Sequence, residues 1–208
     1  MKMVKPSVEL VTATPFALLV IEEAGRTCYK SDGKCKTCLT GTCPECLGRA
    51  ERFIRSIIRR GHESVLEHAS ATFRIVCDRG VTHELVRHRI ASYSQESTRY
   101  CDYSKGVQFI MPDEFEDDII LRDKYLEFCA VSEGYYKWFR ERGLKPQVAR
   151  HVLPIGVKTE IVMTSNFREW RHILRLRTAA DAHPHIRQVM DDVGCWFREN
   201  YPVILEGM

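Results

Sequence analysis

The stretch Arg87–Tyr100, RHRIASYSQESTRY, is the starting point for interpreting this chain. Its cationic groups are Arg87, His88, Arg89 and Arg99. Its short hydrogen-bonding side chains are Ser92, Ser94, Gln95, Ser97 and Thr98. Arginine offers a flat fork of donors and serine a compact donor and acceptor, and both suit phosphate oxygens and base edges. The stretch therefore favours a pocket for a phosphorylated, planar ligand. The alternative is a basic helix end followed by a polar loop.

The bulk composition is that of a soluble globular protein. The chain has 208 residues, of which 44% are hydrophobic and 28% charged, and its formal net charge is +3. That charge is too small to indicate a nucleic-acid-binding protein by itself. No apolar run reaches membrane-spanning length, and the first fifteen residues lack the apolar core of a signal peptide. The sequence therefore predicts a cytoplasmic protein that does not contact a membrane.

Nine cysteines are present, and four of them form two CxxC pairs, Cys35, Cys38, Cys43 and Cys46. Such spacing favours metal ligation over a disulfide framework. Four thiolates can surround zinc tetrahedrally, and a structural metal would hold together a Gly- and Thr-rich loop that has no core of its own. We therefore expect a structural zinc in an insertion at about residues 33–47. Only four residues separate the pairs, against roughly 15–20 in typical zinc ribbons. An iron–sulfur cluster and a metal-free loop are the alternatives.

Hydrophobic periodicity predicts alternating strands and helices. Strands are expected at residues 7–14, 71–77, 107–111 and 159–165. Helices are expected at residues 16–25, 49–60, 81–90, 113–142 (as one helix or as two separated near Gly134), 147–153, 166–177 and 184–201. Loops are expected between residues 26 and 48 and between 91 and 103. This mixture predicts an α+β class and a single domain over residues 1–208.

Four segments of the chain resemble segments of the flavin-dependent thymidylate synthases, and they follow one another in the same order as in that family. Residues Arg87–Ser97 fit the family signature, which is RHR, seven residues, then Ser. The other three are GHESVLEH from Gly61, VARHVLP from Val148, and NFREWRHILRLRTAADAHPHIR from Asn166. A single RHR would mean little, whereas four matches over most of the chain make chance similarity improbable.

The resemblance implies a specific reaction. Enzymes of this family make dTMP from dUMP, with methylenetetrahydrofolate as carbon donor and NADPH as reductant through FAD. It also implies a central, mostly antiparallel sheet flanked by helices, and a homotetramer whose active sites are built from several subunits. Nucleic acid is not expected as a partner.

The resemblance assigns the dUMP site to the helix turn 84–87, to the loop 95–99, and to two arginines further along the chain. These residues are Glu84, Leu85, Val86, Arg87, Gln95, Glu96, Ser97, Thr98, Arg99, Arg150 and Arg177. Ser97, Arg99 and Arg150 can offer donors to the phosphate. Arg177 is expected to be catalytic. Arginine cannot act as a base, but it can stabilise negative charge on the pyrimidine and so activate C5. For Arg177 the alternative is an exposed helix arginine, and for the others surface ion pairs.

The FAD site is implied in the same way, at His62, Ser64, Arg87, His88, Arg89, Gln95, Asn166, Phe167, Arg168 and His172. Histidine and arginine suit a diphosphate, and Asn166 suits the isoalloxazine edge. There is no GxGxxG segment, so a Rossmann crevice is not expected. His62 as a helix cap and His88 as a core histidine are the alternatives.

A cysteine nucleophile is not required by the resemblance, and Cys101 is expected to be a packed thiol. Two other classes of protein compete with this interpretation. A zinc-knuckle nucleic-acid-binding protein would explain the cysteines and arginines but not HESVLEH or NFREWRH. A flavoprotein of the same fold could act on another nucleotide.

Overall fold

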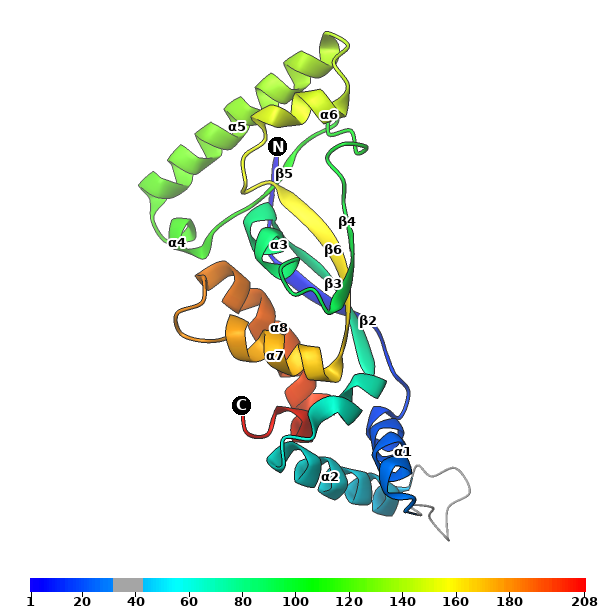
Figure 1. The fold of residues 1–208 in the computed structure, drawn as a ribbon. Coiled ribbons are helices and arrows are strands. Elements are labelled where there is room, and N and C mark those ends of the chain that lie inside the picture. The colour runs from blue at the N-terminus through cyan, green and yellow to red at the C-terminus, as the bar shows by residue number, and fades with distance from the viewer. Residues whose placement is uncertain (32–42) are drawn as a thin grey trace. The chain divides into compact units, whose positions relative to one another are not determined.

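The computed structural model describes residues 1–31 and 43–208 of the chain (Figure 1). The strands are β1 Lys2–Val4, β2 Ser7–Ala13, β3 Ser70–Asp78, β4 Ala91–Gln95, β5 Gln108–Ile110 and β6 Lys158–Asn166. The α-helices are α1 Ala17–Tyr29, α2 Pro44–Arg59, α3 Arg79–Leu85, α4 Asp113–Glu116, α5 Ile119–Glu141, α6 Pro146–Ala149, α7 Phe167–Arg177 and α8 Pro184–Asn200. Three 3₁₀ turns are η1 Glu63–His68, η2 Arg150–Val152 and η3 Pro202–Leu205.

The strands form a four-stranded sheet, in the order β2-β3-β6-β4, and a two-stranded sheet of β1 and β5. The β1–β5 pair is parallel, with Met3 opposite Phe109. The predicted mixture of helices with an antiparallel sheet is confirmed. Of the described helices, none is long and apolar enough to cross a membrane.

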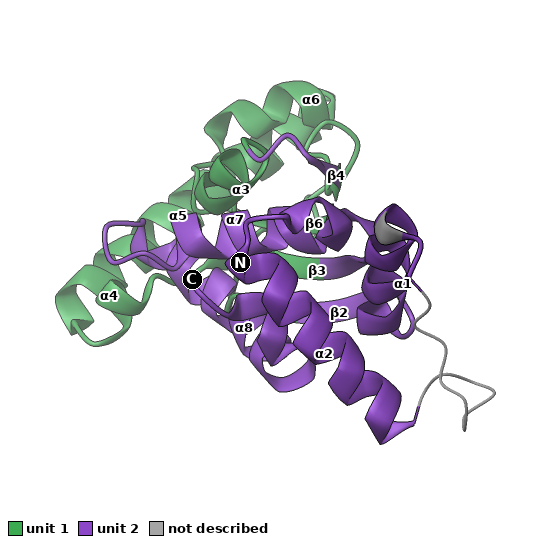
Figure 2. Ribbon diagram, turned by 60° about the horizontal axis from the view of Figure 1, so that its bottom comes forward, with its two compact units in different colours: residues 1–8, 74–87, 93–162 green, residues 9–73, 88–92, 163–208 purple. Residues whose placement is uncertain are grey.

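The chain divides into two compact units (Figure 2). Unit 1 comprises Met1–Val8, Arg74–Arg87 and Tyr93–Val162, and unit 2 comprises Glu9–Phe73, His88–Ser92 and Met163–Met208. That residues 1–208 act as a single domain stays a prediction.

The core of unit 2 is built around aromatic side chains from β3, α7 and α8. Phe73 and Trp170 meet edge to face with ring centroids 5.2 Å apart, and the Trp170 indole donates a hydrogen bond to the Ala71 carbonyl. Phe167 and Phe197 pack in the same way at 5.2 Å. Such pairs stabilise beyond their buried area. They fix α7, the helix that carries the candidate residues Phe167, Arg168, His172 and Arg177.

The core of unit 1 contains a cluster of Val107, Phe109, Cys129 and Val157. Glu133 of α5 is buried beside it and accepts a hydrogen bond from the Val107 amide at 3.0 Å. Burial is the largest single influence on the pKa of this carboxyl, and it acts to raise the pKa. The N-terminal amine, the Val107 amide and Lys137 together outweigh burial, so the pKa lies below its usual value. This contact joins α5 to the segment before β5.

The predicted end of the first helix at Gly25 is wrong. Helix α1 continues to Tyr29, which also shortens the predicted loop that begins at residue 26. A Cβ at Gly25 would lie 2.6 Å from the Phe53 ring of α2. Glycine is therefore needed here for close helix packing and does not end the helix.

Three further boundaries differ from prediction. Helix α2 begins at Pro44 and not at residue 49, because proline is favourable in a first helical turn. The long helical region is broken at Asp117–Asp118 and not at Gly134, since the Asp118 carboxylate accepts from the first amides of α5. Helix α3 ends at Leu85, and the expected loop after it contains strand β4.

Candidate functional site

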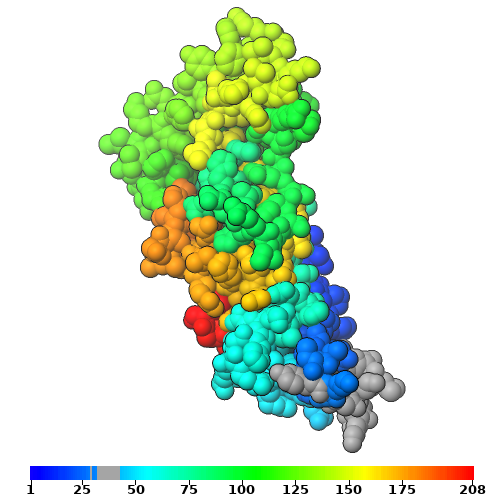
Figure 3. Space-filling model, in the orientation of Figure 1, coloured from blue at the N-terminus to red at the C-terminus, as the bar shows by residue number. Residues whose placement is uncertain are grey.

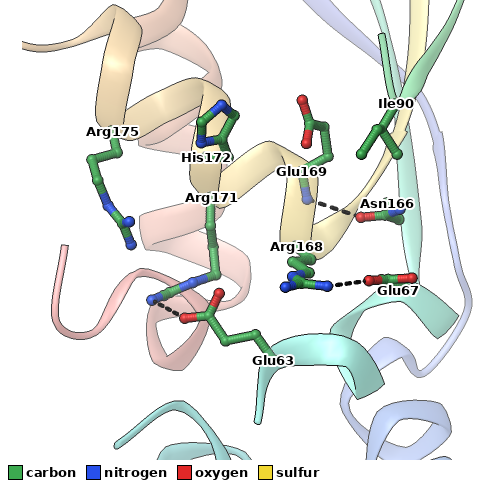
Figure 4. A pocket seen from close by; sticks show the side chains of 9 residues that line it. All are labelled: Glu63, Glu67, Ile90, Asn166, Arg168, Glu169, Arg171, His172 and Arg175. Atoms are coloured by element: carbon green, nitrogen blue, oxygen red, sulfur yellow. Dashed lines mark hydrogen bonds and ion pairs between the residues drawn. The ribbon is translucent and has the colours of Figure 1, made fainter. Parts of the chain in front are cut away.

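A pocket of about 410 Å³ in unit 2 lies between η1, α7 and the residue before β4 (Figure 4). It is lined by Glu63, Glu67, Ile90, Asn166, Arg168, Glu169, Arg171, His172 and Arg175. Three residues expected to contact FAD, Asn166, Arg168 and His172, are therefore brought together. The side chains of η1 and α7 meet at the surface, where Figure 3 draws them in cyan and gold.

Asn166 sets the start of α7. Its side-chain oxygen accepts a hydrogen bond from the Glu169 amide at 2.8 Å, so it caps the helix. The Phe167 amide donates to the Ala69 carbonyl at 2.8 Å, which holds the same turn next to η1. With its oxygen occupied, the Asn166 amide presents its N–H groups as donors. The Phe167 side chain is fully buried, so a ligand could reach only its backbone.

Two ion pairs join α7 to η1. Arg168 pairs with Glu67 at 2.6 Å and Arg171 with Glu63 at 3.2 Å (Figure 4). Arg171 is buried and also bonds to the carbonyls of Ile204 and Glu206, so its role is structural. Arg168 is half exposed, so a ligand anion could compete with Glu67 for its guanidinium.

His62 and Ser64, also expected at the FAD site, are exposed at the start of η1. His62 occupies the N-cap position of this turn, but its side chain makes no capping hydrogen bond. The alternative of a helix-cap histidine is therefore wrong for the imidazole.

His88 is buried in unit 2, as its alternative supposed, but its neighbours are polar. Arg177 Nε donates to His88 Nε2 at 3.0 Å, and Glu169 Oε1 lies 3.6 Å from Nδ1. The His172 ring stands edge to face against it, with centroids 5.9 Å apart. Burial, with the charge of Arg177 and of His172, lowers the pKa of His88 to about 4. The imidazole is therefore neutral near pH 7.

His88, Glu169 and His172 are also the one set of three metal-ligand types that lies within 4.8 Å among the residues the structure describes. Because Arg177 donates to Nε2, the neutral ring carries its proton on Nδ1. That nitrogen is then a hydrogen-bond donor and not a metal ligand.

Unit 1 holds the other expected dUMP residues, which lie at the ends of α3 and β4, directly after these elements, and at Arg150 in η2. Gln95 donates from its amide nitrogen to Thr82 at 2.9 Å and to Thr159 at 3.2 Å. The Leu85 side chain is fully buried and its carbonyl accepts from the Tyr93 hydroxyl at 2.7 Å. Glu96 accepts from Lys158 and from the Tyr103 hydroxyl. These contacts fix the backbone on both sides of the RHR segment.

The remaining residues expected at the dUMP site lie near the ends of these elements. Glu84 is half-buried, and Val86 follows α3 as its C-cap. Arg87, expected at both the dUMP and the FAD site, is exposed between α3 and β4, and so is Arg89, which is expected at the FAD site only. Ser97 is half-buried, and its hydroxyl accepts from the amide of Arg99 at 3.2 Å. None of these side chains is buried in a core, so a ligand could reach them.

A second pocket of about 420 Å³ lies within unit 1 and is lined by Arg79, Thr98, Arg150, His151, Leu153 and Val157. Arg150 donates to the buried Thr98 hydroxyl at 3.2 Å, which brings two expected dUMP residues together. Arg79 and His151 were not predicted. His151 lies next to Arg150 in the VARHVLP segment, which was a usable signal, whereas Arg79 gave none.

The structure describes half of the expected zinc ligands. Cys43 and Cys46 lie at the start of α2 with their sulfurs 3.4 Å apart, while Cys35 and Cys38 fall outside the described residues. Cys101 is half-buried, in keeping with a packed thiol.

Comparison with known proteins places the chain in a family. The chain is 41% identical over 143 residues to the flavin-dependent thymidylate synthase of Pyrococcus furiosus, covering 67% of this chain and 59% of that protein. It is 36% identical over 200 residues to the enzyme of the same name from Mycobacterium tuberculosis, covering 88% of this chain and 76% of that protein.

Among solved structures, the fold is similar to the UMP/dUMP methylase PolB from Streptomyces cacaoi bound with 5-Br dUMP. The TM-score is 0.81 at 23% identity, over 99% of this chain and 96% of that one. The family model described as thymidylate synthase complementing protein, Thy1, matches residues 9–203. The chain therefore belongs to the thymidylate synthase complementing protein (Thy1) family.

Proposed function

We propose that this protein methylates dUMP reductively to dTMP, as a flavin-dependent thymidylate synthase. Methylenetetrahydrofolate supplies the carbon and NADPH the reducing equivalents, through FAD. The observation that carries the proposal is the hydrogen bond at 3.0 Å from Arg177 to the neutral, buried His88 of the RHR segment. It holds a permanent cation in a fixed orientation, as electrostatic activation of a pyrimidine requires.

The pocket of unit 1 supports a nucleotide substrate. Arg79 and Arg150 offer guanidinium donors, and Thr98 and His151 offer further polar groups. A phosphate monoester is best bound by such charge-assisted hydrogen bonds. The structurally similar PolB, a UMP/dUMP methylase, supports this assignment.

The pocket of unit 2 supports a flavin. It combines the amide of Asn166, the exposed guanidinium of Arg168 and the imidazole of His172. These are donors for a ring edge and for a diphosphate. When bound, FAD would supply the hydride; the residues of this chain bind and orient it and the substrate. No cysteine nucleophile takes part in this scheme.

The test begins with the absorption spectrum of the purified protein. A flavin spectrum that is bleached by NADPH, followed by dTMP formation from dUMP and methylenetetrahydrofolate, supports the proposal. A colourless protein that cannot be loaded with FAD contradicts it and favours the nucleic-acid-binding alternative. If the protein is a flavoprotein that methylates UMP but not dUMP, the substrate is UMP and not dUMP.

The catalytic role of Arg177 is tested by Arg177→Ala. Turnover should fall by roughly 100- to 1000-fold, while flavin content stays near wild type. Arg198→Ala is the control, at an exposed arginine of α8 that lines neither of the two pockets described above. Near-normal turnover of Arg177→Ala would contradict the role.

We further propose that Cys35, Cys38, Cys43 and Cys46 bind a structural zinc ion. The 3.4 Å separation of the Cys43 and Cys46 sulfurs is close to the distance of about 3.8 Å between two thiolates on one tetrahedral zinc. Metal analysis should give about one zinc per chain, and a chelator should lower the melting temperature. Well under one equivalent, with no effect of chelation, would contradict this.

A homotetramer with shared active sites and a cytoplasmic location complete the proposal. Both rest on membership of the family. Size-exclusion chromatography with light scattering tests the first, and localisation of a tagged protein tests the second.

A further inference from the structure

The carboxylate of Glu169 has no assigned role, and it lies next to the group that holds Arg177. It stands on α7, two turns before Arg177, and lines the pocket of unit 2. Its Oε1 is 3.6 Å from His88 Nδ1, and both side chains are shielded from solvent, with 12% and 6% of their surface exposed. Burial raises the pKa of this carboxyl.

The direction of the hydrogen bonds fixes the tautomer of His88. Arg177 Nε can only donate, so His88 Nε2 must accept and cannot carry a proton. The proton of the neutral ring is then on Nδ1, which faces Glu169. A carboxylate in that place favours this tautomer and orients the ring, as carboxylates do for other functional histidines. The contact is between a carboxylate and a neutral N–H, and not an ion pair.

We propose that Glu169 is a positioning residue for Arg177 and acts through His88. Glu169 selects the Nδ1–H tautomer, the His88 Nε2 lone pair takes the Arg177 N–H, and the plane of the guanidinium is thereby fixed. The proposal requires no direct contact between Glu169 and Arg177. The inference rests on the proposed function, because the value of a fixed guanidinium is the activation of the pyrimidine.

Two substitutions separate the tautomer role from simple charge. Glu169→Gln keeps a side-chain oxygen that can face Nδ1–H, whereas Glu169→Ala removes it. We expect Glu169→Ala to lower kcat by about 10- to 100-fold with little change in KM for dUMP, because a misplacement of about 1 Å can cost roughly 100-fold in rate. Glu169→Gln should recover most of kcat. Glu199→Ala, an exposed position on α8, is the control and should be unchanged.

Coupling gives a second readout. The variant Arg177→Lys removes Nε. Adding Glu169→Ala to it should lower kcat little further, since the two residues act as a unit. Multiplied losses in the double variant would overturn the proposal. So would wild-type kcat in Glu169→Ala, equal loss in the Gln and Ala variants, or loss of flavin in step with kcat.

A crystal structure of Glu169→Ala tests the proposal even if no enzymatic activity can be measured. The Arg177 Nε to His88 Nε2 contact should lengthen beyond hydrogen-bonding distance in Glu169→Ala and persist in Glu169→Gln. An unchanged contact in both would overturn the inference even in an active enzyme. A protein that forms no dTMP but shows the expected change would instead overturn the proposed function alone.

Discussion

At the scale of single residues, His88 makes stability depend on pH. Its pKa in the folded protein is about 4, below the ordinary value of 6.5, because burial and the nearby Arg177 and His172 disfavour the charged ring. Between these pH values the unfolded chain binds more protons than the folded one. The contribution of neutral His88 is therefore complete above pH 6.5 and is lost as the pH falls toward 4. The maximum loss is about 3 kcal/mol.

The measurement compares wild type with His88→Gln by urea unfolding from pH 7.5 to pH 4.5. The free energy of unfolding of the wild type should fall more steeply with acidification than that of the variant. The other titrating groups, including Glu169 beside the ring, are present in both proteins, so their contributions to the pH dependence cancel in the difference between the two free energies of unfolding. Parallel curves would contradict the lowered pKa.

Arg79 provides a second prediction at this scale. It lines the unit 1 pocket with Arg150, and its guanidinium contacts the Glu96 carbonyl at 3.5 Å. Arg79→Ala should weaken dUMP binding by about 10- to 100-fold, the usual effect of losing a hydrogen bond to a charged group. Calorimetric titration measures it. Arg122→Ala on α5 is the control, and equal Kd values for the two variants would contradict a role of Arg79 in binding.

Residue types at the candidate site were only partly readable from the sequence. Asn166, Arg168 and His172 were expected together because their types match those of a family segment, and they line one pocket. The carboxylates Glu63 and Glu169 were missed, since acidic groups are not expected where an anionic ligand binds. Their partners, Arg171 and His88, are far away in sequence, so only folding reveals the pairing.

At the scale of elements, two helical glycines allow a matched test. A Cβ at Gly25 of α1 would lie 2.6 Å from the Phe53 ring, whereas a Cβ at Gly134 of α5 would meet nothing within 4 Å. Gly25→Ala should therefore destabilise the protein by about 1–3 kcal/mol through overpacking. Gly134→Ala should stabilise it by up to about 1 kcal/mol, because alanine favours helix. Chemical unfolding measures both, and a Gly25→Ala protein as stable as wild type would contradict the close α1–α2 packing.

The same elements indicate which parts of the fold the sequence determines locally. In β3 and β6 every second residue is buried, and both strands were predicted from that alternation. Strand β4 was missed because its residues, ASYSQ, are mostly polar and none is fully buried. The end of α1 was misplaced because the reason for Gly25 is Phe53, which lies in another helix. Local pattern is sufficient where burial alternates, and fails where a distant residue decides.

At the scale of the whole molecule, the candidate residues are divided between the two units. Arg150 and the Gln95–Arg99 segment belong to unit 1, and Arg177 with His88 belongs to unit 2. The proposed chemistry requires both groups of residues at one substrate. In an oligomer with shared sites, they need not come from the same chain.

Coexpression of two inactive variants distinguishes these cases. Arg150→Ala and Arg177→Ala chains carry different tags, and mixed oligomers are isolated by two affinity steps. If one site takes Arg150 from one chain and Arg177 from another, random assembly restores about one quarter of wild-type turnover, because each arginine is intact with even odds. If both come from one chain, no site in the mixed oligomer is complete and it stays inactive. Each variant expressed alone is the control. An inactive mixed oligomer would show that Arg150 and Arg177 of each active site come from the same chain.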